Sequence, residues 1–161
     1  MPDDGLVDID GAGLRVLGRT ECLALLATTH VGRIAVSAQA LPLIAPVRFV
    51  IDGDHIVISI RSGTTLDAAT RDTVVAFEAD GPDGLDGGST VLWSVHVNGI
   101  ARHVTKAVEL RRLAELPLPS RTFGRPQRLV TISTDRLSGR AQIGDDEPDG
   151  PPLVRSGVGT S

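Results

Sequence analysis

Two alternating apolar segments joined by an Asp-Gly turn constrain the fold of this chain more than any other feature. The odd positions from Leu41 to Ile51 are all apolar, and so are the even positions from Ile56 to Ile60. Alternation with a period of two is typical of strands that bury one face. The intervening Asp52-Gly53-Asp54 is a strong hairpin signal. We therefore expect an antiparallel hairpin, with a first strand that the prolines Pro42 and Pro46 keep at an edge or bend.

The register of this hairpin predicts which polar side chains share a face. A loop at Asp52-Gly53 pairs Phe49 with Ile56, and a loop at Gly53-Asp54 pairs Phe49 with Ile58. Both registers place Arg48 on the same face as Ser59 and Arg61. Two arginines without an acidic partner on that face indicate an anion-binding surface. A solvated polar face is the alternative.

The segment after the second strand has two interpretations. Ser62, Gly63, Thr64 and Thr65 form a Gly/Ser/Thr turn that opens a short helix near Leu66. The free N–H groups of a first helical turn, together with hydroxyl groups, can hold a phosphate.

Thr64 followed three residues later by Asp67 also fits a capping box, in which the helix satisfies its own first N–H groups. A carboxylate at that position would repel a second anion. The sequence alone leaves both interpretations open.

The remaining pattern predicts a mainly β chain with a few helices (α+β). We expect further strands at 34–37, 73–80, 90–104 and 129–133, the last continuing towards Arg140, with a bulge at Gly99. Helices are expected from a Thr20 cap to about Thr28 and from a Thr105 cap to about Leu116. Residues 1–13 should be flexible, 14–143 should form one domain, and 144–161 should be a disordered tail.

Composition excludes several function classes. The chain of 161 residues has a net charge of -4 and only 2% aromatic residues, which argues against a nucleic-acid partner. We find no apolar run long enough to span a membrane, and the acidic N-terminus is unlike a signal peptide, so we expect a cytoplasmic protein. The single cysteine, Cys22, excludes an internal disulfide.

No catalytic constellation is recognisable. The four histidines fall in different elements without metal-ligand spacing, so we predict no metal site. Nucleophile-elbow, Walker and Rossmann patterns are absent from the sequence. If the chain is an enzyme, a bound cofactor must carry the chemistry.

The order of the motifs from about Thr20 to Arg140 resembles the pyridoxamine 5′-phosphate oxidase-like flavoproteins, the FMN-binding split barrels, and especially their actinobacterial members. The motifs that carry the resemblance are Val31-Gly32-Arg33-Ile34-Ala35-Val36, Pro46-Val47-Arg48-Phe49, Asp52-Gly53, Gly63-Thr64-Thr65-Leu66, Val75-Ala76-Phe77-Glu78-Ala79-Asp80, Trp93-Ser94-Val95-His96-Val97-Asn98-Gly99 and the segment from Ile132 to Arg140. Each motif is weak alone, but their order and spacing together are fairly specific.

The resemblance implies an antiparallel six-stranded split β-barrel that forms a homodimer. It implies FMN, or a deazaflavin in related branches, in a groove between the subunits, and hydride transfer to or from a small molecule. The phosphate would be held by the strand that ends at Arg61 and by the turn after it. The isoalloxazine would lie against the strand from Pro46 to Phe49, and Trp93-Ser94 would border the groove from one subunit or the other.

One departure from the family pattern affects the cofactor. Relatives that bind FMN commonly have a threonine near position 60 and a lysine at the position of Thr65, whereas this chain has Ile60 and Thr65. Loss of a cation at the phosphate removes about 1.5–3 kcal/mol, or about tenfold to a hundredfold in affinity, unless Arg61 or Arg48 substitutes.

Three functions therefore remain open. The chain is a flavin-dependent oxidoreductase, a protein that binds flavin, deazaflavin or haem without efficient turnover, or a cofactor-free dimer. Substrate contacts in this family lie on variable loops, here 81–89 and 116–127, so the sequence does not identify the substrate or a catalytic residue.

Overall fold

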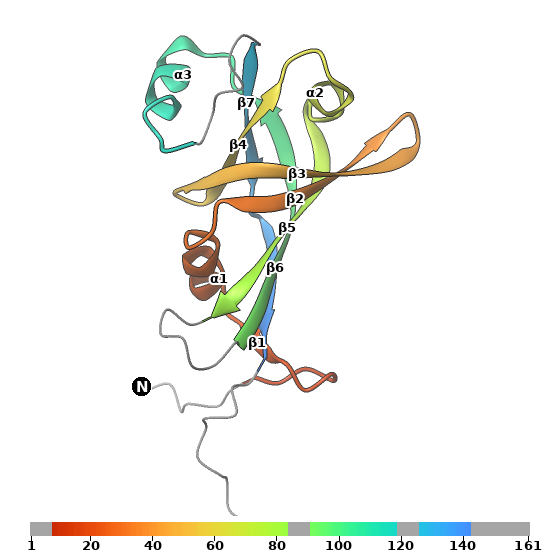
Figure 1. Cartoon of the computed structure of the whole chain (residues 1–161), viewed down its shortest axis with the longest axis vertical. Coiled ribbons are helices and arrows are strands. Elements are labelled where there is room, and N and C mark those ends of the chain that lie inside the picture. Colours follow the sequence, from red (N-terminus) through yellow and green to blue (C-terminus); the bar gives the residue numbers. More distant parts are fainter. Residues whose placement is uncertain (1–7, 84–90, 119–125, 143–161) are drawn as a thin grey trace, which may run out of the picture.

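The computed structural model describes residues 8–83, 91–118 and 126–142 (Figure 1). Within these residues the chain forms three helices and eight strands. The helices are α1 (Arg19–Leu26), α2 (Thr65–Ala69) and α3 (Ala107–Leu113). The strands are β1 (Arg15–Leu17), β2 (Val31–Ala38), β3 (Leu41–Asp52), β4 (His55–Arg61), β5 (Thr73–Asp83), β6 (Val91–His103), β7 (Gln127–Ser133) and β8 (Arg136–Ala141).

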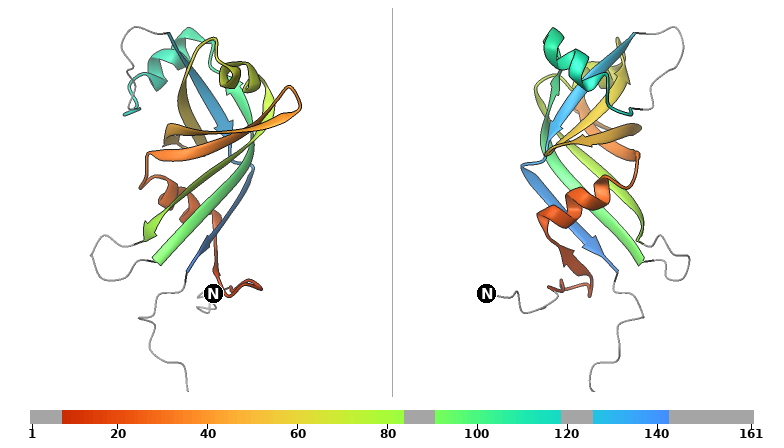
Figure 2. Two further views of the ribbon diagram at one scale, coloured as in Figure 1. Left: turned by 45° about the vertical axis from the view of Figure 1, so that its right-hand side comes forward. Right: turned by 90° about the vertical axis from the view of Figure 1, so that its left-hand side faces the viewer.

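All strand pairings are antiparallel, and six strands close into a barrel. The sheet order is β1-β8-β6-β5-β2-β3-β4-β7, and an additional pairing of β6 with β7 joins the two ends of the six-stranded part. Strands β8 and β1 extend the sheet beyond β6 (Figure 2). The expected mainly β, six-stranded split barrel is confirmed.

The barrel is split because β3 and β6 each change neighbours along their length. The first part of β3 pairs with β2 as far as Arg48, and the remainder pairs with β4 from Phe49 onward. In β6, Trp93 to Asn98 pair with β8, whereas Ala101 to His103 pair with β7. Both strands are therefore shared between the two halves of the barrel.

The predicted bulge at Gly99 is wrong. The β5–β6 ladder runs unbroken from Thr73 opposite Ala101 to Asp83 opposite Val91. Gly99 instead lies where β6 passes from β8 to β7, and a Cβ atom there would collide with the carbonyl oxygen of Ser133. Glycine is required for this close approach. The expected shift in the apolar phase does not occur there, because Ala101 is fully buried on the same face as Val95 and Val97.

The main core fills the barrel. Phe49 and Phe77 are almost fully buried, and their rings meet edge to face with centroids 4.9 Å apart. Helix α1 packs against β3, β6 and β8, and it buries Cys22 and Leu26.

A second, smaller cluster lies outside the barrel under α3. It consists of Val50, Val57, Val104 and Leu113, each at most 7% exposed. Helix α3 therefore covers the outer face of β4 at Val57.

Both predicted threonine caps are wrong. Strand β1 ends at Leu17, and Gly18 is the extended residue that precedes α1, so Thr20 lies inside the first turn. The backbone is still extended at Lys106, so α3 begins at Ala107 and not at Thr105. Neither helix has a side-chain hydrogen bond at its N-cap.

The predicted terminal segments and variable loops lie only partly within the described ranges. Within the N-terminal segment, residues 8–13 form a turn in which the Asp10 carboxylate accepts the N–H groups of Ala12 and Leu14. The first seven residues, the tail from 144 to 161 and most of both predicted variable loops lie outside the described residues.

No helix in the described part of the chain is both long and apolar enough to cross a membrane.

Candidate functional site

The hairpin of β3 and β4 sets the geometry of the candidate site. Its loop is Gly53-Asp54, because Asp52 lies opposite His55 and Phe49 lies opposite Ile58. Gly53 has a φ of 61°, a conformation that glycine adopts without strain. Of the two registers allowed by the sequence, the second is therefore correct.

The side chains of Arg48, Ser59 and Arg61 alternate with buried residues and face outward from the barrel, as predicted. Both arginines are exposed, and Ser59 is half-buried. The Ser59 hydroxyl lies 3.4 Å from Oε1 of Gln127 on the neighbouring strand β7. Within the described residues neither arginine makes an ion pair, so this outer surface carries two uncompensated cations.

The turn after β4 is a helix cap. The Thr64 hydroxyl accepts the Asp67 N–H at 3.2 Å and donates to the Arg61 carbonyl at 2.9 Å. The Gly63 N–H donates to Oδ2 of Asp67 at 2.8 Å, and the Ser62 N–H donates to the Pro126 carbonyl. The capping interpretation is therefore confirmed for Thr64 and Asp67.

The N–H groups of Ser62, Gly63 and Asp67 are thus used within the protein, which leaves fewer backbone donors for a phosphate at this turn. The groups that fit a phosphate are side chains on the outer surface, namely the guanidinium groups of Arg48 and Arg61 and nearby hydroxyls. Ser62 is half-buried and Thr65 is exposed. Thr65 also lines a hollow of about 350 Å³ between α2 and the end of the β2–β3 hairpin at Ser37 to Gln39.

A polar cluster around a buried carboxylate holds the turn at the end of the barrel. Asp67 is only 2% exposed, and its Oδ1 lies 2.8 Å from Nε of Arg128 and 3.6 Å from Nε2 of His103. The Asp67–Arg128 contact is a close charge pair without hydrogen-bond alignment. Nε2 of His103 lies 3.2 Å from the Thr70 hydroxyl at the end of α2. The cluster joins α2 to β6 and β7.

The cluster shifts two pKa values. Burial alone would raise the pKa of Asp67, but the Gly63 N–H and the charges of Arg128 and His103 outweigh burial and lower it. Burial lowers the pKa of His103, the positive charge of Arg128 lowers it further, and Asp67 only partly offsets both. Asp67 is therefore ionised and His103 neutral at neutral pH.

The sequence interpretation missed Arg128 and His103. Arg128 shares the strand face of Val130 and Ile132, which are fully buried, so its phase points a cation towards the barrel interior. This position in the strand alternation could have identified Arg128 from the sequence, because an inward arginine at the end of a strand needs a buried carboxylate.

The other predicted cofactor residues do not join this surface within one chain. The Phe49 ring is fully buried in the core, so only its backbone borders the outer face. Trp93 is 3% exposed, and its indole N–H has no hydrogen-bond partner among the described residues. Ser94 is half-buried near the start of β6, where it lies opposite Arg140 of β8, at the opposite end of the molecule from α2 (Figure 1).

Metal ligands are not gathered at this surface. No group of three histidine, cysteine, aspartate or glutamate side chains that could hold a metal ion occurs in the described ranges.

The fold, together with the two outward arginines Arg48 and Arg61, places this chain in the class of small six-stranded split β-barrel proteins. Comparisons with known proteins identify the family. The family model described as pyridoxamine 5′-phosphate oxidase matches residues 18–141. The chain therefore belongs to the pyridoxamine 5′-phosphate oxidase family, as the motifs predicted.

Several of the similar proteins come from actinobacteria. The chain is 32% identical over 108 residues to an uncharacterised protein of Mycobacterium tuberculosis, a match that spans 64% of this chain and 69% of that protein. The structure of a putative pyridoxamine 5′-phosphate oxidase from Corynebacterium glutamicum is 28% identical, with a TM-score of 0.69 over 86% of this chain and 96% of that chain. The structure of the FAD-binding protein from Mycobacterium smegmatis is 29% identical, with a TM-score of 0.66 over 79% of this chain and 97% of that chain.

Proposed function

We propose that this chain binds a flavin nucleotide through a phosphate on the outer surface formed by Arg48, Ser59 and Arg61. The observation that carries the proposal is the pair of outward arginines, neither of which has an ion-pair partner in the described part of the chain. The hydroxyls of Ser62 and Thr65 lie beside them on the turn and supply further donors. Guanidinium groups are suited to phosphate because they donate two hydrogen bonds in a fixed plane.

The resemblance predicts FMN, and a relative supports a flavin more generally. The similar protein from Mycobacterium smegmatis is described as FAD-binding. FAD is therefore the second candidate, and both ligands offer a phosphate to the same arginines. Comparing the affinities for FMN and FAD decides between them.

The proposed activity is that of a flavin-dependent oxidoreductase acting on a small molecule. When bound, the flavin supplies hydride transfer, and the residues of this chain bind and orient it. Arg48 and Arg61 neutralise the phosphate, and the adjoining strand presents its backbone from Pro46 to Phe49. Binding of flavin, deazaflavin or haem without efficient turnover, and a cofactor-free dimer, are the alternatives.

We further propose a homodimer, which the resemblance implies. Ser94 and the candidate phosphate surface are far apart in one chain, so a site that uses both draws them from two copies. Sedimentation velocity at micromolar concentration tests the homodimer, and a monomer contradicts it.

The visible spectrum of freshly purified protein and fluorescence titrations test the flavin proposal. We expect a flavin spectrum, or recovery of one on adding FMN or FAD. Arg61→Ala should weaken binding by about tenfold to a hundredfold, because it removes a permanent cation from the phosphate. Thr65→Lys should tighten binding or leave it unchanged. Arg111→Ala, on the exposed side of α3, is the matched control and should bind as the wild type does.

Two outcomes contradict the proposal. If Arg61→Ala binds flavin as tightly as the wild type, the phosphate lies elsewhere. If the wild-type protein is colourless and binds neither flavin, the cofactor-free dimer is the better description.

A further inference from the structure

We propose that a polar cavity between α3 and the β3–β4 hairpin, here called the α3 cavity, binds the phosphate or carboxylate group of a small molecule through Arg102 and Lys106. The cavity has a volume of about 420 Å³. Sites for small molecules usually measure about 300–1,000 Å³. The inference concerns a second site and goes beyond the flavin function proposed above.

The cluster under α3 separates this cavity from the outward arginines. Arg48, Val50 and Asp52 follow one another at alternate positions on the outer side of β3, and Val50 is sealed under the helix. The cavity begins beyond Val50, at Asp52 near the tip of the hairpin. The candidate flavin surface and the α3 cavity therefore lie on opposite sides of the covered cluster.

Two strands and one side of the α3 segment supply the proposed ligand-binding groups. Strand β7 contributes the half-buried Thr131, which lies opposite Arg102 of β6. The α3 segment contributes Lys106, Glu109 and Arg112, whose spacing of three residues places them along one side of the helix. Because the sheet and the helix hold these positions, the cavity exists before anything binds.

With its histidines neutral, the lining carries more positive than negative charge. It includes three cations and two carboxylates, namely Arg102, Lys106, Arg112, Asp52 and Glu109. Two nitrogens of Arg112 donate to the two oxygens of Asp52 at 3.0 and 2.8 Å, so this pair is compensated within the protein. Arg102 and Lys106 then face one further carboxylate, Glu109, and the balance favours an anionic ligand.

Both proposed anchor residues are available to a ligand. Lys106 has no ion-pair partner in the described part of the chain, and Arg102 meets only Asp72, at 3.6 Å. The Arg102 and Asp72 side chains are 62% and 81% exposed, so this contact is weak. The hydroxyls of Thr105 and Thr131 line the same cavity and can donate to an oxyanion. Arginine and lysine are the side chains best suited to phosphate and carboxylate.

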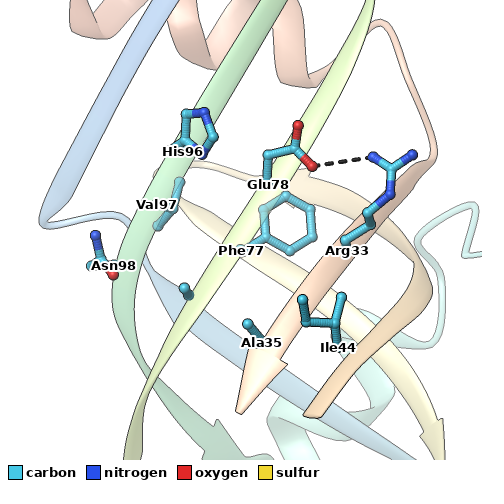
Figure 3. Close-up of a pocket in the computed structure, with 9 residues that line it drawn as sticks. Arg33, Ala35, Ile44, Phe77, Glu78, His96, Val97 and Asn98 are labelled. Atoms are coloured by element: carbon cyan, nitrogen blue, oxygen red, sulfur yellow. Dashed lines mark hydrogen bonds and ion pairs between the residues drawn. The ribbon is translucent and has the colours of Figure 1, made fainter. Parts of the chain in front are cut away.

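A hollow elsewhere on the barrel shows the contrast. It has a volume of about 280 Å³, and Arg33 and Glu78 line it together with small apolar residues (Figure 3). Arg33 donates to Glu78 at 3.1 Å and to Asp80 at 2.8 Å. An anion there would compete with two carboxylates for one arginine, whereas the α3 cavity offers two cations against Glu109.

NMR titration of isotope-labelled protein tests the site. Inorganic phosphate and malonate are added separately and compared with sodium chloride at the same ionic strength. We expect saturable shifts of the backbone amides from Arg102 to Glu109 with phosphate, malonate or both, and no such shifts with chloride. The probe with the lower dissociation constant identifies the preferred anionic group.

Substitutions in the cavity should act in opposite directions. Arg102→Ala and Lys106→Ala should each weaken binding of the better probe about tenfold or more, because each removes a charge-assisted hydrogen bond. Glu109→Gln should tighten binding severalfold, because it removes a like charge. Arg111→Ala is the matched control, since it removes an exposed arginine from the same helix outside the lining. Circular dichroism checks the fold, and either alanine variant in the cavity carries the test if the other does not fold.

Lys106 offers an independent readout, because it is the only lysine in the chain. Acetylation with an N-hydroxysuccinimide ester, followed by mass spectrometry, measures its reactivity against that of the terminal amine. A saturating concentration of the better probe should slow acetylation of Lys106 severalfold and leave the terminal amine unchanged. An unchanged rate at Lys106 would contradict its contact with the anion.

Three outcomes separate this site from the flavin proposal. The inference is overturned if neither probe gives saturable shifts, or if Arg102→Ala and Lys106→Ala bind the better probe as tightly as Arg111→Ala does. If Arg102→Ala weakens FMN binding and Arg61→Ala does not, the flavin phosphate occupies the α3 cavity, which overturns a separate second site. A wild type that binds phosphate or malonate here but no flavin supports the α3 cavity and contradicts only the flavin proposal.

Discussion

The outer surface of the barrel is covered by helix α3 on one side and left uncovered on another. On the β4 side, helix α3 seals Val50 and Val57 against Leu113, and none of these side chains is more than 7% exposed. On the side formed by β2, β3, β5 and β6, Ile44 and Val74 are each more than two thirds exposed. The strands on both sides follow the same alternation, so the difference lies in what covers them.

This contrast separates two uses of an outward apolar residue. Under α3 it forms a second core and stabilises the fold, because burial removes apolar surface from water. On the uncovered face it contributes little to the folded monomer and is available for association. The following predictions test this distinction, from the largest expected effect to the smallest.

Leu113→Ala should lower the free energy of unfolding by about 2–5 kcal/mol, because it leaves a cavity in the cluster under α3. Denaturant unfolding measures the change. Val108→Ala on the same helix is the matched control and should change the free energy by less than about 0.5 kcal/mol. A cost below about 1 kcal/mol for Leu113→Ala would mean that α3 does not seal the covered face.

The polar cluster at the end of the barrel should make stability depend on pH. The folded-state pKa values of Asp67 and His103 are both lowered, so the unfolded chain binds more protons on acidification. Stability should therefore fall as the pH drops below about 6.5, where His103 is protonated in the unfolded chain. It should fall again below about 4, where Asp67 is protonated in the unfolded chain.

Thermal unfolding as a function of pH measures this dependence. His103→Gln should flatten the upper part of the profile, and Asp67→Asn should flatten the acidic part. If the thermal stability of His103→Gln falls as steeply below about pH 6.5 as that of the wild type, His103 is not the cause of the pH dependence.

The tip of the β2–β3 hairpin, at the edge of the uncovered face, carries backbone strain. Gln39 and Ala40 adopt φ values of 51° and 63° without being glycine. Ala40→Gly should raise the free energy of unfolding by about 0.5–1 kcal/mol, because glycine adopts this conformation readily. Gly53→Ala, where φ is 61°, should have the opposite effect in the same denaturant assay. A loss of stability in Ala40→Gly contradicts the strain.

Ile44→Ala should have the smallest effect on folding. At a concentration where the chain is monomeric, the free energy of unfolding should change by less than about 0.5 kcal/mol, since this side chain is 68% exposed. A cost comparable with that of Leu113→Ala would erase the distinction between the two faces.

The local features of the fold were predictable from the sequence. Period-two alternation identified β3 and β4, and the Asp-Gly turn limited their pairing to two registers with one common face. The outward direction of Arg48, Ser59 and Arg61 followed from parity alone. Thr64 as a cap was one of two open interpretations, because the same residues suit a cap and an anion site.

The remaining features depend on contacts between distant segments. The partners of Asp67 come from β6 and β7, some 36 and 61 residues later in the chain, and no local pattern pairs them. Gly99 suggested a bulge because its true reason, the approach of Ser133, arises only when the barrel closes. The sequence pattern also did not predict that Ile44 is exposed, because alternation does not show which sheet faces a helix will cover.

The sharing of β3 and β6 between two ladders has a mechanical consequence. Each half of the barrel is tied to the other by two continuous strands, so the halves cannot rotate as separate rigid bodies about a hinge. Any ligand that arrives at the outer face meets a surface whose shape already exists before binding. The entropy lost on association is then confined to the side chains of that surface, and a single substitution there should change the rate of dissociation more than the rate of encounter.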